Sequence, residues 1–117
     1  MLVFSVVKGT MNKPYIRKLM SRNGEDIWLV DGKYVREHLF LDFTQGGHAL
    51  RYDFIPRYEI WIDDDLSSDE WNAVIAHEQY ERKLMYQGID YNQAHTWANK
   101  VEAQKRGIKI LTGHKND

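Results

Sequence analysis

The second half of the chain contains two consecutive segments with helical periodicity, and each is bracketed by start and stop signals. The first opens on a capping box formed by Ser67 and Glu70 and stops at Gly88, a residue suited to helix C-termini. The second opens on Asp90, with a glutamine in the matching position, and stops at Gly107. The turn between them is tight enough to fold one helix back on the other. The sequence therefore predicts a C-terminal helix pair.

The first half of the chain predicts a β meander. Turn signals occur at Asn23-Gly24, Asp31-Gly32 and Gln45-Gly46-Gly47. Apolar or alternating runs, including one in the C-terminal tail, predict short strands at residues 2–7, 27–30, 33–37, 39–43 (separate or continuing the one before), 49–55, 59–63 and 108–111. Residues 13–22 predict a short helical turn. Because the connections are too short for parallel crossovers, we expect an antiparallel sheet.

Strands followed by helices predict the α+β class, here an antiparallel sheet of about four strands followed by two packed C-terminal helices. The chain has 117 residues, of which 43% are hydrophobic, so we expect a single domain over residues 1–117. Met11 could serve as an alternative start, which would make residues 1–11 dispensable. We expect residues 113–117 to form a loose tail.

The composition excludes several classes of function. The chain has no cysteine, which rules out disulfides, thiolate metal sites and cysteine catalysis. Its formal net charge is −1 and no basic stripe is present, so we expect no nucleic-acid partner. No apolar run approaches the roughly 20 residues of a membrane span, so we expect a cytoplasmic protein with no membrane association. There is no serine nucleophile motif and no glycine-rich phosphate loop.

Three ionisable residues of the first predicted helix lie on or beside its apolar stripe. At about 100° per residue, the stripe contains Trp71, Val74, Ile75 and Met85, and the ionisable residues are His77, Glu78 and Glu81. Charged groups on a core-facing surface are costly unless they are paired or bound to a metal. The helix therefore carries either a metal site or a metal-free polar network, and the sequence leaves both possibilities open.

The second predicted helix supplies further candidates. His77 and Glu81 are four residues apart and stand one above the other on one face. His95 and Glu102 are two turns apart along one edge of the apolar stripe of the second helix. If that helix folds back on the first, His95 could face His77 and Glu81 and complete a set of three metal ligands.

The run from His77 to Glu81 resembles the His-Glu-x-x-His signature of zincin metallohydrolases, as an HExxE variant with Glu81 in place of the second histidine. The resemblance covers roughly residues 58–102, in which an edge strand leads through a capped turn into the helix. It implies a minimal zincin-like fold and a zinc-dependent peptidase or other hydrolase acting on a peptide or protein. The metal ligands would be His77, Glu81 and His95, and Glu78 would be the general base on water.

A His/carboxylate ligand set also suits manganese, iron or nickel, so zinc is not the only ion that the pattern allows. The chain is also similar to small uncharacterised proteins of bacteria and phages that carry a comparable helix pair. That similarity implies no particular activity.

Two more residues are candidates for the same site. Glu102 would hold His95 in place through a hydrogen bond, or replace it as a ligand. His48 follows Gly46-Gly47 and could reach the site as a further ligand or a substrate contact. A histidine beside a turn is more often a surface residue, and we also read His38 and His114 as surface residues.

Each of these residues also has a purely structural interpretation. Glu78 and Arg82 have the spacing of a helix salt bridge, and His95 could simply bond to Glu81 or Glu102 across the helix pair. The protein would then be a non-enzymatic phage-type inhibitor or adaptor, or a degenerate zincin that has lost its metal. A cleft beside an open sheet edge favours a hydrolase. A cluster sealed beneath Trp61 and Trp97 favours a scaffold.

The remaining patterns predict structure rather than function. Trp61, Trp71 and Trp97 have core-facing spacing, and we expect them at the interface between sheet and helices. Residues 63–65, three consecutive aspartates, lack the spacing of a calcium loop and are expected to form a turn. Tyr80 lies off the apolar stripe and could donate a hydrogen bond in a cleft.

Overall fold

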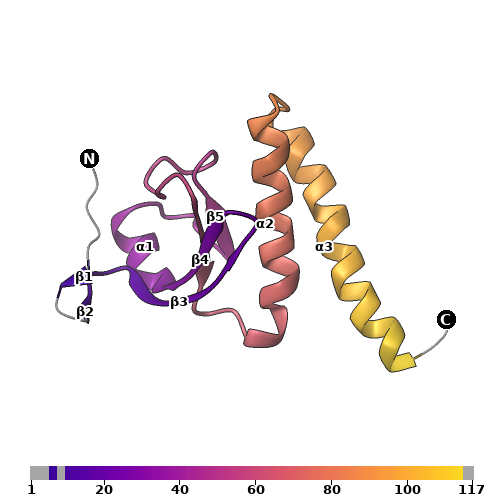
Figure 1. Cartoon of the computed structure of the whole chain (residues 1–117), viewed down its shortest axis with the longest axis horizontal. Coiled ribbons are helices and arrows are strands. Elements are labelled where there is room, and N and C mark those ends of the chain that lie inside the picture. The colour runs from indigo at the N-terminus through magenta and orange to yellow at the C-terminus, as the bar shows by residue number, and fades with distance from the viewer. Residues whose placement is uncertain (1–5, 8–9, 115–117) are drawn as a thin grey trace.

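The computed structural model describes residues 6–7 and 10–114, with side chains for residues 12–107. It has the predicted α+β fold, in which helix α1 covers one face of a four-stranded sheet and a pair of long helices lies on the other side (Figure 1). The elements in chain order are β1 (Val6–Val7), β2 (Thr10–Met11), β3 (Tyr15–Arg22), β4 (Glu25–Val30), α1 (Gly32–His38), β5 (Gly46–His48), β6 (Glu59–Asp63), the 3-10 turn η1 (Ser68–Glu70), α2 (Trp71–Tyr86) and α3 (Tyr91–His114).

The sheet is mixed, so the prediction of a purely antiparallel sheet was wrong. Its strand order is β3-β4-β6-β5, with β3/β4 and β5/β6 antiparallel and β4/β6 parallel. The error came from Asp31-Gly32, which begins helix α1 instead of a hairpin turn. The Asp31 side chain accepts a hydrogen bond from the Tyr34 backbone N–H at 3.0 Å and caps the helix. The crossover over residues 31–58 is therefore long enough for a parallel connection.

Several other strand predictions failed in the same half of the chain. Residues 13–22 contain strand β3 instead of a helical turn, while residues 39–43 and 49–55 form turns and loops. Strand β5 occupies Gly46–His48, where a turn was predicted. These loops carry apolar residues in strand-like patterns because the loops themselves are partly buried. Tyr52 and Phe54, for example, pack against the core beneath α1 without belonging to a strand.

The correct predictions include the turn at Asn23-Gly24, where both residues have positive φ, and the strand over Glu59–Asp63. That strand is β6, which lies between β4 and β5 and is therefore not the edge strand that the zincin resemblance implied. Residues 108–111 belong to α3 instead of a strand, because the helix continues past Gly107. Residues 2–5 of the first predicted strand and the end of the predicted tail, 115–117, lie outside the described residues.

The sheet separates two hydrophobic clusters. Alternate residues of β6 face opposite sides, so Ile60 and Ile62 pack toward α2 with Trp71, whereas Trp61 packs with the cluster beneath α1. The predicted interface role is therefore confirmed for Trp71. It was wrong for Trp61, which is fully buried on the other face, and for Trp97, which is 46% exposed.

The three aspartates at the end of β6 form a turn, as predicted. Asp63 is buried and pairs with Arg36 at 2.6 Å, and its second carboxylate oxygen accepts the backbone N–H of Asp65. Asp64 accepts the backbone N–H of Gly32 at 3.1 Å. These contacts tie the start of α1 to the end of β6 and set the direction in which the chain leaves the sheet toward α2.

Helix α2 begins and ends close to the predicted signals, and α3 begins at its predicted cap, but the predicted stop of α3 at Gly107 was wrong because the helix runs to His114. Ser67 precedes η1 and makes no side-chain cap bond, although its hydroxyl donates to Glu70 at 3.1 Å, so α2 starts one turn later. At the other end, the N–H groups of Gly88 and Ile89 bond to the carbonyls of Met85 and Leu84, the pattern of a Schellman motif.

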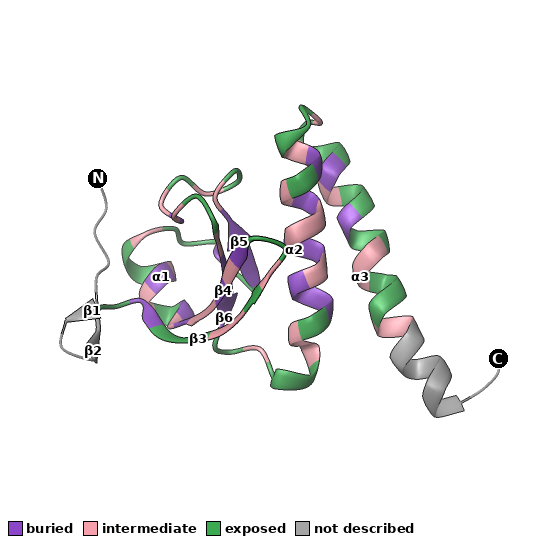
Figure 2. Ribbon diagram, viewed as in Figure 1, coloured by how far each residue is buried: buried purple, intermediate pink, exposed green. Residues whose placement is uncertain are grey.

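Asp90 then caps α3 by accepting the N–H of Gln93. Buried positions follow α2 along the side that faces the sheet and α3 (Figure 2). Among the described residues, no helix is both long and apolar enough to cross a membrane.

Candidate metal centre

Glu81 lies at the centre of a cluster of histidines that comes from three different elements. His95 Nδ1 on α3 lies 2.8 Å from Glu81 Oε2, and His77 Nε2, one turn earlier on α2, lies 3.3 Å from the same oxygen. His48 Nε2 on β5 lies 2.7 Å from the other oxygen, Oε1. The Glu81 side chain is only 3% exposed. The structure thus brings together the three residues predicted as ligands and adds His48.

The spacing of these atoms fits a tetrahedral metal ion. One ligand atom from each of His77, Glu81 and His95 lies within 4.8 Å of the others. Ligands at about 2.05 Å from a tetrahedral zinc ion are separated by roughly 3.3 Å. The distance from His77 to Glu81 already has this value, and the distance from His95 to Glu81, 2.8 Å, would lengthen by about half an ångström. These groups could therefore hold a metal ion after a small outward movement of His95.

His48 is fixed in the orientation of a hydrogen-bond donor to Glu81. Its Nδ1 accepts the backbone N–H of Leu50 at 3.2 Å, so the ring proton resides on Nε2 and is donated to Glu81. His48 is fully buried, which shows that its interpretation as a surface residue was wrong. A second possible metal group combines His48 with Glu78 and Glu81. We favour the group with His77 and His95, because a protonated Nε2 has no lone pair for a metal.

Glu78 is buried without the salt bridge that the sequence suggested. Arg82, its expected partner, instead pairs with Glu25 at 3.0 Å, and the helix salt bridge is absent. The cationic group nearest to Glu78 is His77, whose Nε2 lies 4.0 Å away. Burial raises the pKa of Glu78 from its ordinary value to about 8. A carboxyl group with such a pKa is a candidate for general acid–base chemistry.

Electrostatics distinguish the two glutamates on this turn of α2. Burial would raise the pKa of Glu81, but its hydrogen bonds to the three histidines outweigh burial and hold the pKa well below its usual range. Glu81 is therefore an anion at neutral pH. Burial lowers the pKa of His77, but the hydrogen bond to Glu81 and the surrounding carboxylates outweigh burial, so its pKa lies above the usual value.

Glu102 contacts a different histidine from the one expected. Its Oε1 lies 3.0 Å from His77 Nδ1, which is ion-pair distance although the contact does not meet hydrogen-bond geometry. No hydrogen bond or ion pair joins Glu102 to His95 among the described residues. Arg106 pairs with Glu102 at 2.8 Å and with Glu70 at 3.1 Å. Glu102 is thus placed to orient the ring of His77, and Arg106 holds Glu102 in position.

The cluster opens into a cavity of about 460 Å³ beside an edge of the sheet. Strand β5 is the outermost strand on this side, and Thr44, Gln45 and Gly46 form one wall. Tyr91 also lines the cavity, with the Arg51 guanidinium 4.3 Å from its ring centroid. The His95 side chain is 41% exposed. The cluster is therefore reachable from solvent and is not sealed beneath Trp61 and Trp97.

Of the other predicted residues, His38 is exposed, as expected, and His114 has no described side chain. The residue whose importance the sequence underestimated is His48. The sequence signal for a buried His48 was its position after two glycines. A glycine at position 46 lets strand β5 approach α2 closely and so brings His48 to the site. A Cβ atom at Gly46 would lie 2.7 Å from the Trp61 carbonyl oxygen and 3.2 Å from Val74.

Comparisons of the chain with protein-family models, curated proteins and solved structures found no match. The resemblance to zincins therefore remains a prediction from the sequence motif that begins at His77.

Proposed function

We propose that this protein is a zincin-like metal-dependent hydrolase in which His77, Glu81 and His95 hold a zinc ion. The observation that carries the proposal is the convergence of three ligand atoms, from two helices, within 4.8 Å at a solvent-connected cavity. Anionic Glu81 would supply the negative charge that a divalent cation requires. His48 and Glu102, which contact Glu81 and His77 respectively, would fix the orientation of the ligands.

Glu78 is the residue that we assign as general base. A bound zinc ion polarises water and a substrate carbonyl group. Glu78 lies on the same turn of α2 as the ligands, and among the described residues its one cationic neighbour within ion-pair distance is His77, whose Nε2 lies 4.0 Å away, because Arg82 pairs with Glu25. Its pKa would fall from about 8 beside a divalent cation, which would make it an acceptor for the proton of the attacking water. The same carboxyl group would then deliver that proton to the leaving amine.

The edge of the sheet supports a peptide substrate. Extended peptides bind to sheet edges through main-chain hydrogen bonds. β5 is the outermost strand beside the cavity, and its three residues, Gly46–His48, are buried, so a peptide would have to approach it from the cavity. Arg51 lines the same cavity and makes no ion pair among the described residues. A guanidinium that has tyrosine neighbours but no ion pair at this position favours a substrate that carries a carboxylate near the bond to be cleaved.

Metal content is the first test of this proposal. We expect native mass spectrometry to find about one zinc ion per chain in the wild type, in Glu78→Gln, and in His38→Ala, which removes an exposed histidine as a matched control. The ion should be absent from His77→Ala. A chelator should lower the melting temperature of the proteins that hold the ion. Absence of metal from the wild type, together with an unchanged melting temperature in chelator, would reject the proposal.

Catalysis is tested separately with peptide libraries. If the wild type cleaves a peptide, Glu78→Gln should lose about a hundredfold or more of the rate while it keeps the metal, because the variant lacks a proton acceptor. Equal rates for wild type and Glu78→Gln would remove Glu78 from the mechanism and leave the metal site intact.

One observation favours the alternative of a non-enzymatic inhibitor or adaptor. Glu81 already has three histidines around it, so the buried charge is compensated without a metal. This alternative predicts that the wild type binds no zinc and that its stability does not respond to chelator.

A further inference from the structure

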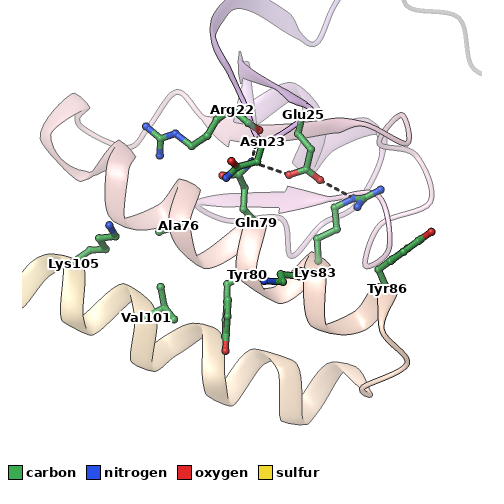
Figure 3. Close-up of a pocket in the computed structure, with 11 residues that line it drawn as sticks. Arg22, Asn23, Glu25, Ala76, Gln79, Tyr80, Lys83, Tyr86, Val101 and Lys105 are labelled. Atoms are coloured by element: carbon green, nitrogen blue, oxygen red, sulfur yellow. Dashed lines mark hydrogen bonds and ion pairs between the residues drawn. The ribbon is translucent and has the colours of Figure 1, made fainter.

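A second and larger cavity, of about 660 Å³, lies between the β3–β4 turn and the helix pair (Figure 3). It receives side chains from that turn, from α2 and from α3. Its described lining residues are all different from those of the cavity at the metal centre. Function at one cavity can therefore be tested without altering the other.

The only carboxylate that lines this cavity, among the described residues, is neutralised. Glu25 pairs with Arg82 at 3.0 Å and accepts a hydrogen bond from Gln79 at 2.9 Å. Gln79 also donates to the Arg22 carbonyl at 2.8 Å, which ties α2 to the turn between the strands. Figure 3 shows Glu25, Gln79 and Arg22 where α2 meets the turn. Since these groups satisfy one another, this part of the lining is close to neutral.

The remaining charges of the lining are positive and unpaired. The side chains of Arg22, Lys83 and Lys105 line the cavity and make no ion pair or hydrogen bond among the described residues. Three like charges around one cavity repel each other, and an anion placed between them would remove that repulsion.

The cavity also offers apolar and aromatic surface. Tyr80 extends from α2 toward α3, where Val101 lies nearby (Figure 3). Tyr86, at the end of α2, is 68% exposed although it is a large aromatic residue. Neither tyrosine makes a hydrogen bond or a ring contact among the described residues. These rings could stack on the flat body of a ligand whose charged group contacts the lysines.

We propose that this cavity binds a small aromatic anion, with its phosphate or carboxylate group held by the cationic side chains of the lining and its aromatic ring against Tyr80. The volume suits a molecule of this size, since ligand sites typically enclose roughly 300–1,000 Å³. The tyrosine rings provide the preference for an aromatic body.

The test is a titration of the full chain followed by NMR or calorimetry with four probes. Phenyl phosphate carries both features, whereas phenol lacks the anion and inorganic phosphate lacks the ring. Benzoate replaces phosphate by carboxylate and distinguishes the two sources of the charge. We expect phenyl phosphate or benzoate to bind at least about tenfold more tightly than both phenol and inorganic phosphate.

The variants are Lys83→Gln/Lys105→Gln and a charge-matched control, Lys33→Gln/Lys100→Gln, whose lysines lie outside the cavity. Loss of one exposed ion pair weakens binding by up to about fivefold, so the cavity variant should lose about fivefold or more. The control should keep the wild-type affinity. Equal weakening of both variants would show general charge attraction and overturn the proposal, as would equal binding of all four probes.

The variant His77→Ala separates this proposal from the proposed function. It should keep the affinity for the aromatic anion while it loses the metal, because His77 lies outside this cavity. Binding that disappears with His77→Ala would place the anion at the metal centre and refute the proposal for the second cavity.

Discussion

Replacement of Glu78 by glutamine tests the electrostatic basis of the candidate metal centre. The residue is 7% exposed, and burial raises the pKa of its carboxyl group from 4.5 to about 8. The neighbouring carboxylates add to this effect, and His77 opposes it. Glutamine has nearly the same shape and carries no charge at any pH. The substitution therefore removes the titration and leaves the packing in place.

The sign of the effect follows from proton binding. Between pH 4.5 and about 8, folded Glu78 retains a proton that the unfolded chain has released. Stability therefore falls as the pH rises through this window, and the loss is complete only above a pH of about 8. Integration from pH 5 to pH 8 gives a loss of about 3 to 4 kcal/mol. That is a large fraction of the roughly 5 to 15 kcal/mol that stabilise a typical domain.

The assay is urea unfolding at pH 5 and pH 8 with a chelator present. Relative to the wild type, Glu78→Gln should gain about 3 to 4 kcal/mol in stability between the two pH values. Glu37→Gln, at an exposed position of α1, is the matched control and should stay within about 0.5 kcal/mol of the wild type at both. Parallel pH curves for wild type and Glu78→Gln would refute the reasoning, because they would mean that burial does not shift this pKa.

Four further substitutions test the site and the helix pair. Glu81→Ala leaves the histidines without their shared acceptor and should destabilise the metal-free protein by about 3 kcal/mol or more at pH 6. The pKa of Glu81 is depressed, so the difference in free energy of unfolding between the wild type and Glu81→Ala, measured in urea, should narrow as the pH falls below 4.5. His48→Ala should weaken zinc binding by about 10–100-fold in competition with a chelating dye, whereas complete loss of the metal would make His48 a ligand. Gly88→Ala should lower stability by about 1 kcal/mol because φ is +97° at Gly88, and Gly107→Ala, in the interior of α3, should raise it by a similar amount. Thermal unfolding in which both alanines shift stability in the same direction would contradict this assignment.

The sequence by itself determined the helix pair and most of the candidate centre. Helical periodicity places His77, Glu78 and Glu81 on a core-facing stripe whatever the rest of the chain does, because residues four apart always share a face. The Schellman glycine and the Asp90 cap are local as well, and both were confirmed. A tight turn between two helices leaves little choice but antiparallel packing, which is why the approach of His95 to Glu81 was predictable.

Some short sequence patterns are typical of two different structures, and the local sequence could not decide between them. Asp31-Gly32 suits a hairpin turn and a helix start equally well, and the structure shows a helix start. That single choice made the sheet mixed, moved the crossover to residues 31–58 and placed β5 at an edge. His48 became part of the candidate centre as a consequence.

The partners of the buried charges were decided only by the tertiary structure. Local spacing pairs Glu78 with Arg82, yet Arg82 reaches Glu25 on β4, and Glu102 lies against His77 instead of His95. A salt bridge within a helix contributes a few tenths of a kcal/mol, whereas a buried carboxylate without a partner costs several. Long-range pairing therefore prevails over local spacing, and it can be known only when the distant elements are in place.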